Sequence, residues 1–144
     1  MDVFRTMDVI SSGLTAERTR LNAIASNVAN ANSTQGVDGG AYKRKDVVLQ
    51  SDPLQAEFGE VLDEKKEIYT EVRVAEIKED QSGGRPVYKP EDPRANAEGY
   101  VYMPNVNPVE EMANMISADR AFQSNVNVFQ TTKQMALKAL EIGR

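Results

Sequence analysis

Residues 107–144 read NPVEEMANMISADRAFQSNVNVFQTTKQMALKALEIGR, and this stretch decides the fold. Asn107 is a good helix N-cap, Pro108 fits the first helical position, and Glu110 follows the cap by three residues. Apolar residues then recur in two heptad rows, one of Met112, Val126 and Leu140 and one of Met115, Phe122, Phe129 and Ala136. The segment therefore predicts one long amphipathic helix.

The apolar stripe of this helix is wider than one partner helix would cover. It is broadened by Val109, Ile116, Val128 and Leu137. We therefore expect more than two neighbours, although a plain intramolecular hairpin remains an alternative on periodicity alone. Asp119 and Lys133 interrupt the first row, so each is expected to have a partner or to lie at the edge of the seam.

The N-terminal segment predicts a second long helix, from Asp2 to about Ala31. At the helical rise its length would be about 45 Å. Its apolar residues recur at steps of three and four, with Glu17 in the one gap: Val3, Met7, Ile10, Leu14, Leu21, Ile24, Val28 and Ala31. Asn27 and Asn30 share one face, and we expect such amides to bond across helix interfaces and fix their register.

The middle of the chain predicts short strands with a thin core of their own. Strands are expected at 42–50, 68–79 and 100–103, and the turn Gln81-Ser82-Gly83-Gly84 predicts that 85–89 returns as the hairpin partner of 68–79. Residues 51–66 are acidic and ambiguous, and Lys43-Arg44-Lys45 is expected to be an exposed strand start or to contact an acidic neighbour.

The predicted fold class is therefore α+β, with two long terminal helices in a coiled-coil-like inner domain and a small β-rich middle domain. The expected boundaries are 1–35 and 105–144 for the helical inner domain, and 36–104 for the β-rich outer domain. Both terminal segments are electrically neutral, so the whole net charge of −5 lies in the middle.

Composition disfavours an enzyme. The chain has no His and no Cys, which removes the usual general base, the thiolate nucleophile and the commonest metal ligands. No catalytic, metal or cofactor site is expected. A pI of about 4.8 disfavours nucleic acid, and no small-molecule substrate is expected. Polar residues interrupt any secretory or membrane-spanning apolar run near the N-terminus, so export would use another route.

Two groups of residues resemble a known family. Residues 25–32, ASNVANAN, followed by Tyr42-Lys43-Arg44, resemble the N-terminal signature of the bacterial flagellar rod and hook family. Residues 99–112, GYVYMPNVNPVEEM, and 117–126, SADRAFQSNV, are more specific and resemble its proximal-rod member. The resemblance covers essentially the full length, and it departs at Phe122, where the family often has Tyr.

The resemblance implies a structural subunit of the flagellar basal-body rod. Family members pair their terminal helices, stack helically around a central export channel and transmit torque. The implied partners are further copies, other rod proteins, the base at the MS ring and export gate, and the type III export apparatus during secretion. The implied location is the rod that spans the periplasm. Alternatives are another rod subunit of the family, or a soluble helical-hairpin adaptor or export-related protein.

The expected site is an assembly interface on the two helices. Its predicted residues are Met7, Ile10, Leu14, Leu21, Ile24, Asn27, Val28, Asn30, Met112, Met115, Phe122, Val126, Phe129, Ala136 and Leu140.

Overall fold

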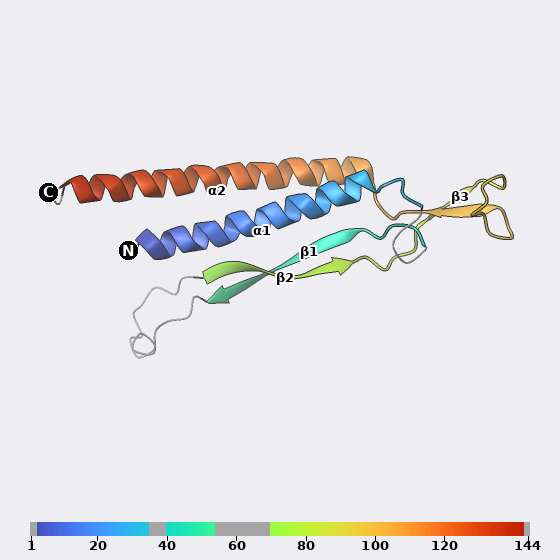
Figure 1. Cartoon of the computed structure of the whole chain (residues 1–144), viewed down its shortest axis with the longest axis horizontal. Coiled ribbons are helices and arrows are strands. Elements are labelled where there is room, and N and C mark those ends of the chain that lie inside the picture. Colours follow the sequence, from blue (N-terminus) through green and yellow to red (C-terminus); the bar gives the residue numbers. More distant parts are fainter. Residues whose placement is uncertain (1–2, 35–39, 54–69, 143–144) are drawn as a thin grey trace.

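The structure is a computed structural model that describes residues 3–34, 40–53 and 70–142. Its elements in chain order are α1 (Val3–Ala29), β1 (Lys45–Pro53), β2 (Thr70–Glu79), β3 (Arg85–Tyr88), β4 (Tyr100–Met103) and α2 (Pro108–Ile142). Two long terminal helices with small antiparallel sheets between them confirm the predicted α+β class (Figure 1).

Both helices begin and end close to where the sequence predicts. The amide of Val109 donates to Asn107 Oδ1 at 3.2 Å, and the amide of Glu111 donates to the Asn107 carbonyl at 3.0 Å. Asn107 is therefore the N-cap of α2. Asp119 and Lys133 lie exposed, at the edge of the helix pair, as predicted.

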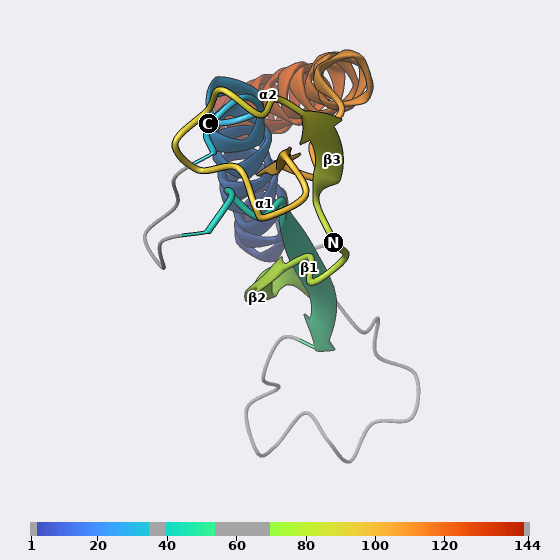
Figure 2. The same cartoon turned by 90° about the vertical axis from the view of Figure 1, so that its right-hand side faces the viewer.

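α1 is the central layer of the molecule. It packs against α2 on one side and against β1 and β2 on the other (Figures 1 and 2). Among the described elements, α2 contacts only α1, and the β3–β4 pair contacts no helix or other strand. The side chains of α2 are therefore shielded from solvent mainly by α1.

The strand pairing differs from the prediction. β2 pairs with β1 along its whole length, from Lys45 opposite Glu79 to Pro53 opposite Thr70. β3 pairs instead with β4, so the predicted hairpin of 68–79 with 85–89 is wrong. A Cβ added at Gly84 would overlap the carbonyl oxygen of Met103, so the absence of a side chain at Gly84 lets the chain approach the end of β4 closely.

The first predicted strand begins later than expected, at Lys45, because the residues before it contact the helices. Of the ambiguous segment 51–66, Ser51–Pro53 belongs to β1 and the remainder lies outside the described residues.

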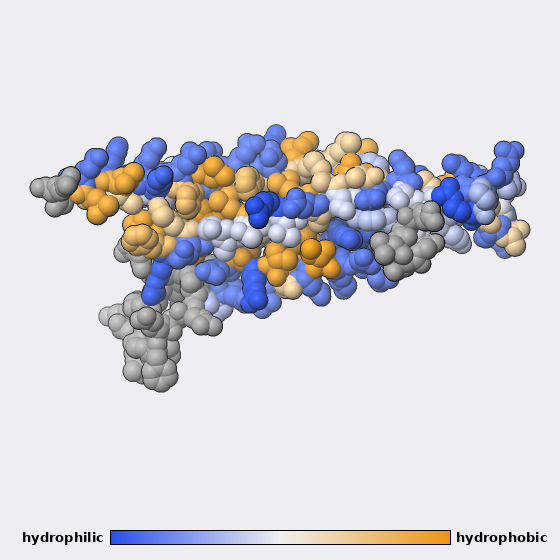
Figure 3. Space-filling model, viewed as in Figure 1, coloured by the Kyte–Doolittle hydropathy of each residue, from blue (hydrophilic) through white to orange (hydrophobic). Residues whose placement is uncertain are grey.

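The buried apolar core is small and consists mainly of alanine. Its members are Ala16, Ala23, Ile24, Ala31, Val101 and Ala118. A Cβ added at Gly13 would lie 3.4 Å from the Asn125 amide nitrogen, so α1 and α2 approach closely there. Larger apolar residues remain on the surface along the helices (Figure 3).

Candidate assembly site

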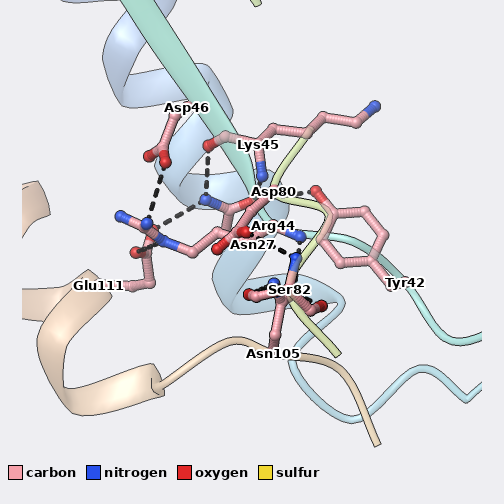
Figure 4. A network of polar contacts seen from close by, with 9 residues as sticks. All are labelled: Asn27, Tyr42, Arg44, Lys45, Asp46, Asp80, Ser82, Asn105 and Glu111. Atoms are coloured by element: carbon pink, nitrogen blue, oxygen red, sulfur yellow. Dashed lines mark hydrogen bonds and ion pairs between the residues drawn. The ribbon is translucent and has the colours of Figure 1, made fainter. Parts of the chain in front are cut away.

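A cluster of polar side chains joins the C-terminal end of α1, the start of β1 and the first turn of α2 (Figure 4). We call it the polar junction and define it as Asn27, Tyr42, Arg44, Lys45 and Glu111. It lies where the two helices that carry the predicted assembly residues meet, at the end of α1 and the start of α2.

Asn27 is the centre of the polar junction and is only 1% exposed. Its amide nitrogen donates to Glu111 Oε2 and to the Lys45 carbonyl, both at 2.9 Å. Its amide oxygen accepts from the Lys45 amide at 2.9 Å and from the Tyr42 hydroxyl at 3.0 Å. Two donors and two acceptor sites are all that an asparagine side chain has. The residue therefore fixes the register of three chain segments at once.

Glu111 is a buried carboxylate, also 1% exposed. Its Oε1 accepts from Arg44 Nε at 2.8 Å, while Arg44 Nη1 also pairs with Asp46 at 3.0 Å. The hydrogen bond to Glu111 is the main reason that the pKa of Arg44 is raised above its ordinary value. A buried charge needs such a partner, and this charge-assisted bond ties α2 to the segment that precedes β1.

The junction extends toward the turn after β2. The amide of Arg44 donates to Asn105 Oδ1 at 3.0 Å, and Asn105 Nδ2 donates to the Ser82 hydroxyl at 2.9 Å. The amide of Ser82 in turn donates to Asp80 Oδ1 at 2.9 Å. Hydrogen bonding to Ser82 lowers the pKa of the Asp80 carboxyl. Polar contacts therefore run from α1 to the turn that leads into β3.

Asn27 bonds across the helix interface, in agreement with the expectation, but Asn30 does not. The Asn30 side chain, one residue after the end of α1, donates its amide nitrogen to the Ser26 carbonyl of that helix at 2.8 Å. Arg44 meets an acidic neighbour, which was one of the two outcomes expected for 43–45.

Glu111 is absent from the residues that the sequence predicts for the site. The available signal was its position, because it lies four residues before Met115 and seven before Ala118, on the face that packs against α1. A charged residue at such a position predicts a buried partner.

The predicted assembly residues fall into three groups. Ile24 and Asn27 are buried, whereas Met112 and Leu140 are exposed. The others are half-buried: Met7, Ile10, Leu14, Leu21, Val28, Asn30, Met115, Phe122, Val126, Phe129 and Ala136. The fold thus shields most of the predicted residues partly and leaves Met112 and Leu140 exposed.

Comparison with known proteins decides the family. Residues 7–36 match the family described as flagella basal body rod protein, and residues 97–142 match the flagellar basal body rod FlgEFG protein C-terminal family. The flagellar basal-body rod protein FlgC of Salmonella typhimurium is 43% identical over 100% of both chains. The FlgC proteins of Bacillus subtilis and Aquifex aeolicus are 41% and 38% identical, over 97% or more of each chain.

This chain belongs to the FlgC family of flagellar basal-body rod proteins. It is a structural, non-enzymatic subunit of the basal-body rod, and the rod family implies assembly with other rod subunits. The two matched regions contain Asn27 and Glu111, respectively, so the polar junction joins the two regions that match the flagellar rod families.

Among the residues that the structure describes, acidic side chains do not form a group of three that could hold a metal ion. Neither described helix has an apolar stretch long enough to cross a membrane. The structure does present exposed apolar side chains along its helices, which neighbouring subunits can cover.

Proposed function

We propose that this FlgC-family subunit assembles helically through its paired terminal helices, so that successive copies surround the export channel and transmit torque along the rod. In this arrangement residues 1–35 and 105–144 form the inner domain and residues 36–104 form the outer domain. The pairing of α1 with α2 supports an inner helical layer, and the β3–β4 pair, which contacts none of the other described helices and strands, supports an outer projection.

The proposal rests on one observation. The single chain buries mostly small apolar side chains and leaves large apolar side chains exposed. The buried core is mostly alanine, while large apolar residues of α2 such as Val109 and Leu140 are more than two-thirds exposed. Burial of such side chains stabilises by about 1.5–3 kcal/mol each. Neighbouring copies in a rod would bury them, and tightly interdigitated helices would resist the deformation that torque applies.

The proposed partners follow from the same arrangement. They are further copies of this chain, the other rod proteins, the base of the rod at the MS ring and export gate, and the type III export apparatus during secretion. The neutral terminal helices can crowd together without electrostatic repulsion, which favours many like neighbours around one axis.

The test is the shortening of a large side chain in the helix seam. Phe122→Ala and Phe129→Ala should each remove about 1–3 kcal/mol of packing in the assembled rod, since each ring is already half-buried by α1 in the single chain. Swimming and intact rods in purified basal bodies are the measurements. Gln130→Ala, on the exposed side of α2, is the control. Normal rods in both phenylalanine variants would count against assembly through this seam.

A further inference from the structure

Both strands of the β3–β4 pair are edge strands. Within the part of the chain that the structure describes, no third strand pairs with either of them. An unpaired edge presents backbone donors and acceptors that can bind a strand of another molecule. Because this chain is a rod subunit that assembles with other subunits, these edges meet other protein chains at close range.

Charged side chains, the usual protection of an edge, are nearly absent from this pair. β2 carries five charged residues among its ten, whereas β3 and β4 together carry one, Arg85. β4 reads Tyr-Val-Tyr-Met, and its Tyr100 and Tyr102 are 40% and 55% exposed. An exposed, uncharged segment of high strand propensity is typical of aggregation sites. The pair therefore needs another form of protection.

The hydrogen-bond pattern shows which backbone groups point outward. The amide of Lys89 donates to the carbonyl of Gly99 at 2.8 Å, so these two opposed residues form a hydrogen-bonded pair. Hydrogen-bonded and non-hydrogen-bonded pairs alternate along an antiparallel ladder. The next pair, Tyr88 opposite Tyr100, is therefore not hydrogen-bonded, and its backbone groups point to the outer edges.

A proline occupies the outer edge of β3. Pro86 lies two residues before Tyr88, so its backbone faces the same edge. Proline has no amide hydrogen, and this edge therefore lacks a donor within the strand. The residues on either side, Arg85 and Val87, belong to hydrogen-bonded pairs with β4, where a proline would break the ladder. The proline thus stands where it weakens the edge and leaves the pair intact.

An asparagine occupies the outer edge of β4. The amide of Asn96 donates to the Tyr100 carbonyl at 2.9 Å, and the Tyr100 amide donates to Asn96 Oδ1 at 2.8 Å. Both outward groups of Tyr100 are thus bonded, as they would be by a neighbouring strand. The amide of Gly99 donates to the Asn96 carbonyl at 2.9 Å and holds Asn96 in place. Two residues beyond Tyr102, Pro104 has no amide hydrogen.

We propose that Pro86 and Asn96 close the two edges of the β3–β4 pair against strand addition by a second copy of this chain. The pair then meets its neighbours through side chains and not through backbone pairing. This inference concerns the edges alone, so it holds for the free subunit and does not depend on assembly through α1 and α2.

The experiment restores the missing donor. Pro86→Thr places an amide hydrogen on the outer edge of β3 and introduces a residue of good strand propensity. The purified full chain and the variant are compared by sedimentation velocity over a range of concentrations. We expect the variant to form an additional dimer as the concentration rises, because one open edge pairs with the same edge of a second copy. In that dimer the Tyr88 amide should exchange several-fold more slowly than in the dilute variant.

Opening the second edge should change the size of the assembly. Asn96→Ala removes the acceptor of the Tyr100 amide, so the double variant with Pro86→Thr should form species larger than a dimer. A double variant that stops at the dimer would exclude Asn96 as the second protecting residue. Pro93→Thr is the matched control, because it removes an exposed proline from the turn between β3 and β4 without adding a donor to either edge.

Protection of the Val101 amide, which faces β3, shows that the pair is still formed in each variant. Pro86→Val repeats the measurement with a residue of higher strand propensity, in case threonine disturbs the pair. The proposal is overturned if both position 86 variants keep the size of the unmodified chain at every concentration. Association without slower exchange at Tyr88 would also overturn it, because the contact would then lie elsewhere.

Discussion

The hydroxyl of Ser12 accepts a hydrogen bond from the backbone amide of Val72 at 3.1 Å. It thereby ties β2 to the first half of α1, while Asn27 ties the start of β1 to the last turns of the same helix. At the helical rise these two points lie about 22 Å apart along α1. The strand pair cannot slide along the helix unless both ties break.

Ser12→Ala should lower the free energy of unfolding by about 1 kcal/mol, because the amide of Val72 loses its acceptor. The sharper readout is hydrogen exchange, where the Val72 amide should exchange faster than in the unmodified chain. Ser11→Ala, one residue earlier and exposed, is the matched control and should leave that amide unchanged. Unaltered exchange at Val72 in the Ser12 variant would contradict the tie.

Asn27→Ala should be far more damaging than Asn30→Ala. Removing the Asn27 amide leaves both polar groups of the Lys45 backbone and one oxygen of Glu111 without this partner, at a cost of about 2–4 kcal/mol. The Asn30 side chain donates to the carbonyl of Ser26, four residues earlier, and its loss should cost about 1 kcal/mol or less. Urea unfolding of both variants measures the difference. Equal losses would mean that Asn27 does not fix the register.

Both helices could be predicted because their signals are local. Apolar spacing, the cap at Asn107 and the face shared by Asn27 and Asn30 are all read within a few residues, and the structure confirms both helices. The pairing of the strands depends on residues that are far apart in the sequence. β2 finds β1 across a long intervening segment, and the turn at 81–84 carries no information about that choice.

The site was only partly predictable for a related reason. Glu111 is acidic and lies near a helix start, which usually indicates an exposed residue favourable to the helix dipole. Its burial becomes reasonable only when Arg44, distant in sequence, is placed 2.8 Å away. Likewise, small residues such as Gly13 and Ala118 lie between the two helices, and a search for large apolar residues overlooks them.

Gly84→Ala should disturb the β3–β4 pair, whereas Gly83→Ala should not. A Cβ at Gly84 would overlap the carbonyl oxygen of Met103, but a Cβ at Gly83 meets nothing within 4 Å. We expect a loss of about 1–3 kcal/mol for Gly84→Ala and a change within about 0.5 kcal/mol for Gly83→Ala. Hydrogen exchange of the β3 and β4 amides together with urea unfolding checks both. Similar behaviour of the two variants would argue against the close approach.

Asp80 should make stability depend on pH in the acid range. Hydrogen bonds from the Ser82 amide, then from its hydroxyl, lower the pKa of Asp80 from its ordinary value of 3.8. A carboxyl with a lowered folded-state pKa contributes stability above its unfolded pKa, and that contribution is lost as the pH falls through the folded pKa. The measurement is the urea midpoint from about pH 6 down to about pH 3.

Asp80→Asn should flatten the acid part of this profile. Ser82→Ala is the matched control, because it removes the hydroxyl but keeps the backbone donor, which is the larger cause of the shift. It should therefore retain most of the dependence. A profile for Asp80→Asn that falls as steeply as that of the unmodified chain would exclude this turn as the source.

The pairing of Arg44 with Glu111 predicts strong energetic coupling between the two side chains. Arg44→Ala leaves a buried carboxylate with Asn27 as its remaining donor, and we expect a loss of about 2–4 kcal/mol. Glu111→Gln removes the charge, so adding Arg44→Ala to it should cost much less. The double-mutant cycle should show a coupling of about 1–3 kcal/mol in urea unfolding.

Arg120→Ala, which changes an exposed arginine on α2, is the control and should change the free energy of unfolding by no more than about 0.5 kcal/mol. Strictly additive losses at positions 44 and 111 would show that the charge on Glu111 is not held by Arg44, and that the contact between α2 and the start of β1 depends on packing alone.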